Sequence, residues 1–306
     1  MDDDSRFVEA VKTTTELSEK KIREALNQGR AGVHDPLQAS NATVSDVPDG
    51  YVGVHLFVMV HGFQGNHNDM RLFKNQISLQ YPDAVVLLST SNEEKTEEDI
   101  EEMGERLAVE VKQYVQSFCP ASCINRISFI GHSLGGLIIR AALPHLAEYS
   151  TKFFTYISLG SPHLGYMYNQ NKLFDAGMWL LKKWRNSKSL TQLSMSDQRL
   201  YEETTLYRLT TLPGLEWFQN VMLVCSFQDQ YAPFDSTRIQ ICKQALYEHS
   251  GEAINLEGGN RSAQAIVAGN ENNRGNQYIA MAQNLLMNLN AKLLYRLDVN
   301  FHIKDK

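Results

Sequence analysis

Residues 126–136 read R-I-S-F-I-G-H-S-L-G-G, and this stretch decides the fold of the chain. A β-rich apolar run ends at its first glycine, and a helix-patterned segment follows the last one. The G-x-S-x-G between them, centred on Ser133, has the pattern of a nucleophile elbow, a sharp strand-to-helix turn that strains the backbone of its serine. The same letters also occur by chance in plain strand-to-helix turns. Because a strand precedes the motif and a helix follows it, we predict that Ser133 is a catalytic nucleophile.

The residues beside Ser133 suit such a turn. Gly131 and Gly135 lie two positions before and after the serine, where the lack of a Cβ lets neighbouring backbone approach closely. The helix that follows would place the positive end of its dipole beneath the serine oxygen. We therefore expect Gly131, His132 and Gly135 to support the elbow.

Length and composition bound the class of protein. A chain of 306 residues forms one large α/β domain or two small ones, and 43% hydrophobic with 21% charged residues is typical of globular proteins. A formal charge of −6 argues against nucleic acid as a partner, since that requires a basic face. Among the four cysteines, Cys119 and Cys123 have a C-x₃-C spacing that is typical of neither redox motifs nor zinc ribbons. We expect reduced thiols and no metal.

The first fifty residues carry no recognisable chemistry. They begin M-D-D-D-S-R, without the apolar region of a signal peptide. A loosely helical segment at 6–28 gives way to a connector rich in Gly, Asp, Pro, Ser and Asn, so we treat 1–50 as an N-terminal extension. The longest apolar run of the chain, 56–60, is far too short to cross a bilayer. We expect an intracellular, cytoplasmic protein.

From 51 to 306 the pattern is that of one α/β domain. Apolar runs typical of buried strands alternate with segments of helical periodicity, which implies a mostly parallel central sheet with helices on both faces. The alternation breaks at 166–216, a segment rich in large apolar and basic residues that we interpret as a helical cap insertion. The predicted strands are 52–60, 84–88, 126–130, 153–159, 221–225 and 292–299, and the later predicted helices are 236–248 and 277–289.

An acidic run at 93–102 reads E-E-K-T-E-E-D-I-E-E and precedes a predicted helix that continues to Phe118. Thr96 with Asp99 resembles a capping box, and acidic residues favour the first turn of a helix. A metal site is the minor interpretation, because nothing in the pattern arranges these carboxylates into a cage. We predict helix capping here.

The remaining catalytic groups should follow Ser133 in chain order, first an acid and then a histidine, each beyond the carboxyl end of a strand. His302 comes directly after the last predicted strand, which is the place that this layout requires. His249, at the end of a predicted helix, is the alternative, but contact with the helix dipole explains it. Asp229 follows the strand at 221–225 and is the preferred acid. Asp235, otherwise a helix N-cap, and Asp197 are weaker candidates.

Acyl transfer also needs donors for the developing oxyanion. The backbone N–H of Leu134, directly after the nucleophile, is one candidate. The loop after the first core strand should supply the other, and Phe63 is the best candidate because Gly62 allows close backbone approach. His61 is then a structural clamp on this loop rather than a base. His163, in S-P-H-L-G, either lines the acyl pocket or is an ordinary turn histidine.

Four motifs carry a family resemblance: V-M-V-H-G-F-Q-G, F-I-G-H-S-L-G-G-L-I-I-R, S-L-G-S-P-H-L-G and S-F-Q-D-Q-Y-A-P-F-D-S-T-R-I. In this order they resemble the serine-esterase, lipase-like family of α/β-hydrolases, most closely the group called "family with sequence similarity 135", over about 51–306. The resemblance implies an α/β-hydrolase fold, a triad of Ser133, Asp229 and His302, no cofactor, and a link to cellular lipid metabolism. Members are mostly larger and continue past the histidine into a C-terminal helix. Since this chain stops at Lys306, we expect an incomplete chain or a less well supported His302 loop.

The expected function is hydrolysis of carboxylic esters, with acyl-glycerol or phospholipid esters as substrates. In one interpretation the apolar side of 170–185 covers acyl chains, and its basic end, with Lys182, Lys183 and Arg185, makes a peripheral contact with anionic membranes. In the other, the segment is an ordinary helix with one core face. Three alternatives stay open: a catalytically idle scaffold that acts as a binding module, an esterase for small esters or thioesters, and non-ester chemistry such as a peroxidase.

Overall fold

A computed structural model describes residues 53–118, 123–168, 187–250, 273–287, 289 and 294–300, and within these ranges the chain forms one parallel sheet. Every neighbouring pair of strands is parallel, as the alternation of strand and helix patterns predicts. The strands are β1 (Val54–Val60), β2 (Val85–Leu88), β3 (Ile124–His132), β4 (Phe153–Leu159), β5 (Asn220–Cys225) and β6 (Leu294–Asp298).

The strand order, β2-β1-β3-β4-β5-β6, reverses once. From β1 the chain moves outward to β2, and it then returns to place β3 on the other side of β1. The carboxyl ends of β1 and β3 therefore meet where the winding changes direction. In open parallel sheets this switch point is the usual place for a ligand. The loop 61–65 follows β1 and Ser133 follows β3, so the topology brings these two segments together.

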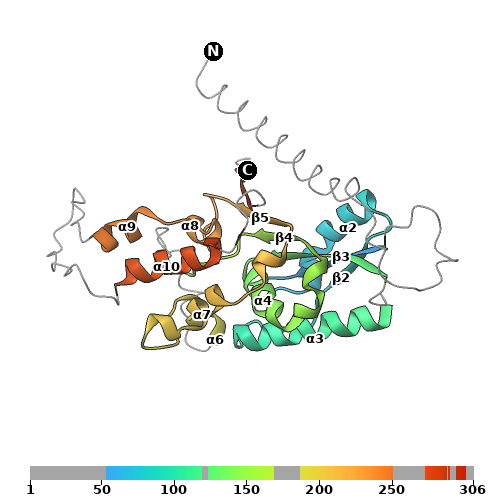
Figure 1. Ribbon diagram of the computed structural model, residues 1–306, viewed down its shortest axis with the longest axis horizontal. Coiled ribbons are helices and arrows are strands. Elements are labelled where there is room, and N and C mark those ends of the chain that lie inside the picture. The colour runs from blue at the N-terminus through green and yellow to red at the C-terminus, as the bar shows by residue number, and fades with distance from the viewer. Residues whose placement is uncertain are drawn as a thin grey trace, which may run out of the picture.

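Helices cover both faces of the sheet (Figure 1). The helices α3 (Ile100–Phe118) and α4 (Leu134–Ala142) lie on one face, and α2 (Arg71–Gln80) lies on the opposite face. Alternate residues of β1 explain this, because Leu56 and Val58 contact the α3 and α4 side while Phe57 packs with α2 through Ile77.

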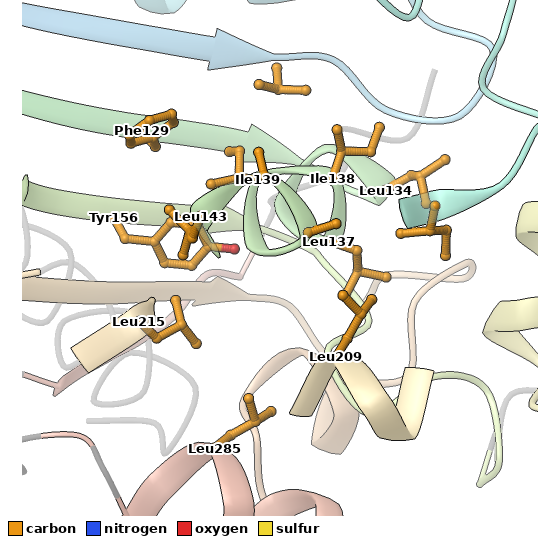
Figure 2. Close-up of a cluster of buried hydrophobic side chains, with 14 of the residues drawn as sticks. Phe129, Leu134, Leu137, Ile138, Ile139, Leu143, Tyr156, Leu209, Leu215 and Leu285 are labelled. Carbon is orange, nitrogen blue, oxygen red and sulfur yellow. The ribbon is translucent and has the colours of Figure 1, made fainter. Parts of the chain in front are cut away.

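The elbow helix α4 is the centre of the core (Figure 2). Its sequence, L-G-G-L-I-I-R-A-A, has no polar face, and all nine of its residues are buried. Phe129 and Tyr156 of the sheet contact one side of the cluster, and Leu209 of α7 (Thr205–Thr211) and Leu285 of α10 (Arg274–Met287) close the other. Ser133 is therefore carried on an element that packs on every side.

Two predicted helices differ from the structure. The helix predicted at 236–248 is two helices, α8 (Phe234–Thr237) and α9 (Lys243–Ser250), because Ile239 between them has a φ of +52°. The helix predicted at 277–289 begins earlier, with α10 at Arg274. After α4 the chain continues as a 3₁₀ segment, η2 (Leu143–Lys152), that has Pro144 in its first turn.

The predicted cap at 166–216 lies partly outside the described residues, and Trp179 and Trp184 belong to that part. The described part consists of short helices: α6 (Lys188–Leu193), η3 (Tyr201–Glu203), α7 and η4 (Leu215–Trp217). The cap itself stays a prediction. Among the described helices, none has the length and apolar character needed to cross a membrane.

Candidate active site

Ser133 sits at the turn between β3 and α4 with a strained backbone, at φ 51° and ψ −121°. Its N–H donates to the carbonyl of Leu159 at the end of β4, at 2.8 Å. The flanking glycines are required by space, since a Cβ on Gly131 would lie 2.5 Å from the nitrogen of Gly136 and one on Gly135 would lie 2.4 Å from the oxygen of Val60. The geometry is that of the predicted elbow.

The loop after β1 lies against this serine. A Cβ on Gly62 would be 3.0 Å from the Cβ of Ser133, so a larger residue here would force the loop or the serine to shift. His61 is buried, with Nδ1 3.0 Å from the carbonyl oxygen of Gly62, a contact that suits the expected clamp. The N–H of Phe63 has no hydrogen-bond acceptor among the described residues, and Leu134, as the first residue of α4, has none within its helix. Backbone donors are thus available on both sides of Ser133.

Asp229 lies in the loop after β5 and reaches toward the elbow. Its Oδ1 accepts from the N–H groups of Tyr231 at 2.8 Å and Ala232 at 3.0 Å, which orients the carboxylate. Its Oδ2 is 3.1 Å from the place where a Cβ on Gly160 would be, at the end of β4. Desolvation lowers the pKa of His132, while the charges of Asp69 and then Asp229 oppose that shift. The Asp229 carboxylate is therefore close enough to the elbow to act on it electrostatically.

The alternative acids have other surroundings. Burial raises the pKa of Asp235, whose charge acts on Cys242 and Tyr278 rather than on the elbow. Asp197 accepts the N–H of Thr205 at 2.8 Å, at the start of α7. Asp197 therefore has a structural role at the start of α7. The N-cap role expected of Asp235 is wrong, because it lies within the first turn of α8 and the N-cap position belongs to Pro233.

The predicted base, His302, lies outside the described residues. β6 ends at Asp298, four positions earlier, and pairs in parallel with β5, which leads to Asp229. The alternative histidine, His249, is exposed at the end of α9, with Nδ1 2.6 Å from Oδ1 of Asn276. Its surroundings give it no contact with the elbow.

A buried polar cluster beneath α4 could not be read from the sequence. His163 is fully buried, with Nε2 2.8 Å from the hydroxyl of Ser158 and with its carbonyl accepting from Arg140 at 3.2 Å. Burial lowers the pKa of His163 well below its usual value, and the charge of Arg140 adds to this. His163 is thus a neutral structural residue, and the suggestion that it lines the acyl pocket is wrong. The available signal in the sequence was a single arginine, Arg140, within an otherwise apolar helical segment.

The acidic run at 93–102 caps α3, as predicted, and it also supports the loop after β1. Asp99 caps α3 by accepting the N–H of Glu101 at 2.8 Å, so the predicted capping box with Thr96 is wrong. Thr96 instead accepts the N–H of Gln64 at 2.8 Å. Within the described ranges, no group of three or more His, Cys, Asp or Glu residues could hold a metal ion.

Comparison with known proteins agrees with this geometry. Residues 52–244 match the family described as "Putative serine esterase (DUF676)". The chain belongs to this family. The match includes the loop after β1, the elbow and the Asp229 loop, and it ends before β6. The parallel sheet with an elbow at Ser133 is that of an α/β-hydrolase fold, as expected for a family described as serine esterases.

Two relatives from the yeast Saccharomyces cerevisiae share part of the sequence. "Putative lipase ROG1" is 29% identical over 174 residues, which cover 53% of this chain and 24% of the yeast protein. "Putative lipase YDL109C" is 33% identical over 123 residues, which cover 36% of this chain and 18% of that protein. The chain therefore matches a quarter or less of each relative's length. Among solved structures, lipase B of Aspergillus fumigatus aligns over 60% of this chain and 39% of its own, with 16% identity and a TM-score of 0.41.

Proposed function

We propose that the protein hydrolyses carboxylic esters through an acyl-enzyme formed on Ser133. The observation that carries this proposal is the strained elbow, with φ 51° at Ser133 and backbone donors available at Phe63 and Leu134. A strained turn of this kind exposes the serine oxygen to an incoming carbonyl, while the two N–H groups accept the negative charge that develops on the carbonyl oxygen.

The proposed mechanism uses the predicted triad. His302 takes the proton of Ser133 as the serine oxygen attacks the acyl carbon, and it then gives that proton to the departing alcohol. Water hydrolyses the acyl-enzyme by the same route. Asp229 holds the imidazole in the required tautomer and stabilises its charged form. The hydrogen bonds from Tyr231 and Ala232 to Asp229 support this role, because they fix the carboxylate without neutralising it.

We also propose lipid esters as the substrate class. Three features support this choice. The yeast relatives carry the name lipase, and apolar residues are concentrated in 166–216. A third is the exposure of Phe227 and Tyr231, which flank Asp229 and are 72% and 60% exposed. Large aromatic side chains in solvent beside a candidate active site suit contact with acyl chains.

A fluorophosphonate probe tests the hydrolase proposal directly. We expect one equivalent of probe on Ser133 in the folded protein and none in Ser133→Ala, because only an activated serine reacts at a useful rate. Peptide mapping by mass spectrometry identifies the labelled residue. Folded protein that does not label supports the idle binding scaffold, and labelling at another serine contradicts the assignment of the nucleophile.

A chain-length series of p-nitrophenyl esters tests the substrate class. Each additional buried CH₂ contributes about 0.8 kcal/mol, so kcat/KM should rise from acetate to medium and long acyl chains. Trp179→Ala tests whether the predicted cap provides that apolar surface, and it should flatten the series. If acetate is the best substrate and the variant keeps the same profile, the small-ester alternative is correct.

A further inference from the structure

The loop that carries Phe63 has an unfavourable backbone conformation. Gly65 donates to the carbonyl of Gly62 at 3.1 Å, which makes 62–65 a β-turn with Phe63 and Gln64 at its centre. Gln64 has a φ of +53°, at the turn position where glycine or asparagine is favoured. A glutamine in this conformation persists only where surrounding contacts hold it.

Those contacts come from the acidic run. The N–H of Gln64 donates to the hydroxyl of Thr96 at 2.8 Å, and its side-chain Nε2 donates to Glu97 at 2.6 Å. Next along the loop, the N–H of His67 donates to Glu93 at 2.8 Å. Of these acceptors Thr96 is the one that lies in the core, with 2% of its surface exposed. Its hydroxyl fixes the peptide that joins Phe63 to Gln64, and through it the direction of the adjoining Phe63 N–H.

Thr96 and its neighbour Glu97 are held in place by hydrogen bonds from α6. The hydroxyl of Ser189 donates to the carbonyl of Thr96 at 2.7 Å, and the N–H of Lys188 donates to the carbonyl of Glu97 at 2.8 Å. Both donors belong to α6, which lies within the predicted cap at 166–216. The segment 96–97 thus joins the cap region to the loop beside Ser133.

We propose that Thr96 is a positioning residue that aligns the Phe63 N–H for the oxyanion. The proposal rests on the proposed function, since it assigns a role to the same site. Thr96 touches no substrate and acts through Gln64. The neutral hydroxyl suits the task because it accepts one hydrogen bond in a buried place where a carboxylate would be costly to desolvate.

Thr96→Val tests this role, because valine keeps the shape and removes the acceptor. Loss of a whole oxyanion donor lowers kcat about 10²–10³-fold, so a misaligned donor should lower kcat about 10–100-fold with KM within about twofold of wild type. The rate of fluorophosphonate labelling should fall in parallel. Thr96→Ser keeps the hydroxyl and should restore kcat to within about threefold of wild type. If Thr96→Val does not fold, Thr96→Ala removes the same acceptor and must show the same loss.

Thr210→Val is the matched control. Thr210 is equally buried, at 2% exposure. Its hydroxyl donates to the carbonyl of Tyr207 at 2.6 Å and accepts from Nδ2 of Asn284 at 3.2 Å, neither of which belongs to the loop after β1, so the variant should keep wild-type kcat. Wild-type kcat in Thr96→Val, or equal losses in Thr96→Val and Thr96→Ser, would overturn the proposal. Wild-type protein that neither labels nor turns over ester contradicts the proposed function instead, so the two failures are distinguishable.

Discussion

Two aspartates that follow β5, six positions apart, have different surroundings. Asp229 accepts two backbone N–H groups and lies beside Gly160 at the end of β4. Asp235 lies in α8, where burial raises its pKa and the charge of Arg238 opposes the rise. Of the two, Asp229 is the one whose carboxylate is fixed by backbone N–H groups beside the end of β4. The catalytic role of either residue can be decided by substitution.

We predict that Asp229→Asn lowers kcat for ester hydrolysis about 10⁴-fold. The amide keeps the oxygen that accepts the two N–H groups, but it no longer holds the histidine in its reactive tautomer. Asp235→Asn is the matched control and should stay within about threefold of wild type. Steady-state kinetics on one p-nitrophenyl ester measures both variants. A large loss in Asp235→Asn alone would transfer the role of the acid to that residue.

At the scale of elements, the edge strand β6 is held by side chains as well as by its pairing with β5. Arg238 forms an ion pair with Asp298 at the end of β6. Arg296, within the strand, donates from Nε to the carbonyl of Arg238 at 2.8 Å and from Nη2 to the carbonyl of Ile239 at 3.0 Å. These contacts join β6 to the segment after α8. They therefore fix the position of the strand end from which the chain continues to His302.

We predict that Arg238→Gln lowers kcat about tenfold with little change in KM. A loosened β6 would displace the predicted base, and small displacements of catalytic groups are costly to the rate. Arg208→Gln is the control, because Arg208 forms a comparable surface ion pair with Glu101, at 2.7 Å, away from β6. Kinetics and thermal unfolding of both variants separate the two effects. Equal kcat in the two variants would show that β6 does not depend on this ion pair.

At the scale of the whole molecule, two histidines have lowered pKa values, one of them fully buried (His163) and the other half-buried in the sheet (His55). His55 of β1 lies 2.8 Å from the hydroxyl of Ser128 and stacks on Phe57 with ring centroids 4.1 Å apart. Burial, with a smaller contribution from the charge of Arg126, lowers the pKa of His55 from 6.5 to about 3. Burial is also the main reason why the pKa of His163 is lowered. The unfolded chain therefore binds more protons than the folded protein below about pH 6.5.

Global stability should fall as the pH falls. The contribution of each such histidine is present above its unfolded pKa of 6.5 and is lost progressively toward the folded pKa, about 3 for His55. From pH 7 to pH 5 the protonation of unfolded His55 should lower the free energy of unfolding by about 2 kcal/mol. Urea unfolding of wild type and His55→Gln at both pH values measures this. The variant should lose about 2 kcal/mol less than wild type, and an unchanged pH dependence would contradict the prediction.

Much of the fold was determined by the sequence alone. The strand at 153–159 was predicted to the residue, and the parallel sheet and the elbow at Ser133 follow from apolar runs and a five-residue motif. These features can be read from short stretches of sequence. A run of consecutive apolar residues is typical of a strand buried on both faces, and a sharp turn requires glycine close to it in the chain. For the same reason the family could be identified from short motifs in order.

Only the tertiary structure decided which side chains serve these elements. Thr96 suggested a helix cap, yet its hydroxyl bonds Gln64, 32 positions earlier. His163 suggested a turn or a pocket, yet it is buried against Arg140, 23 positions away. A hydroxyl or an imidazole satisfies several kinds of partner equally well, and its own sequence neighbours do not select one. Packing selects the partner, because a buried polar group must bond whatever the fold places beside it.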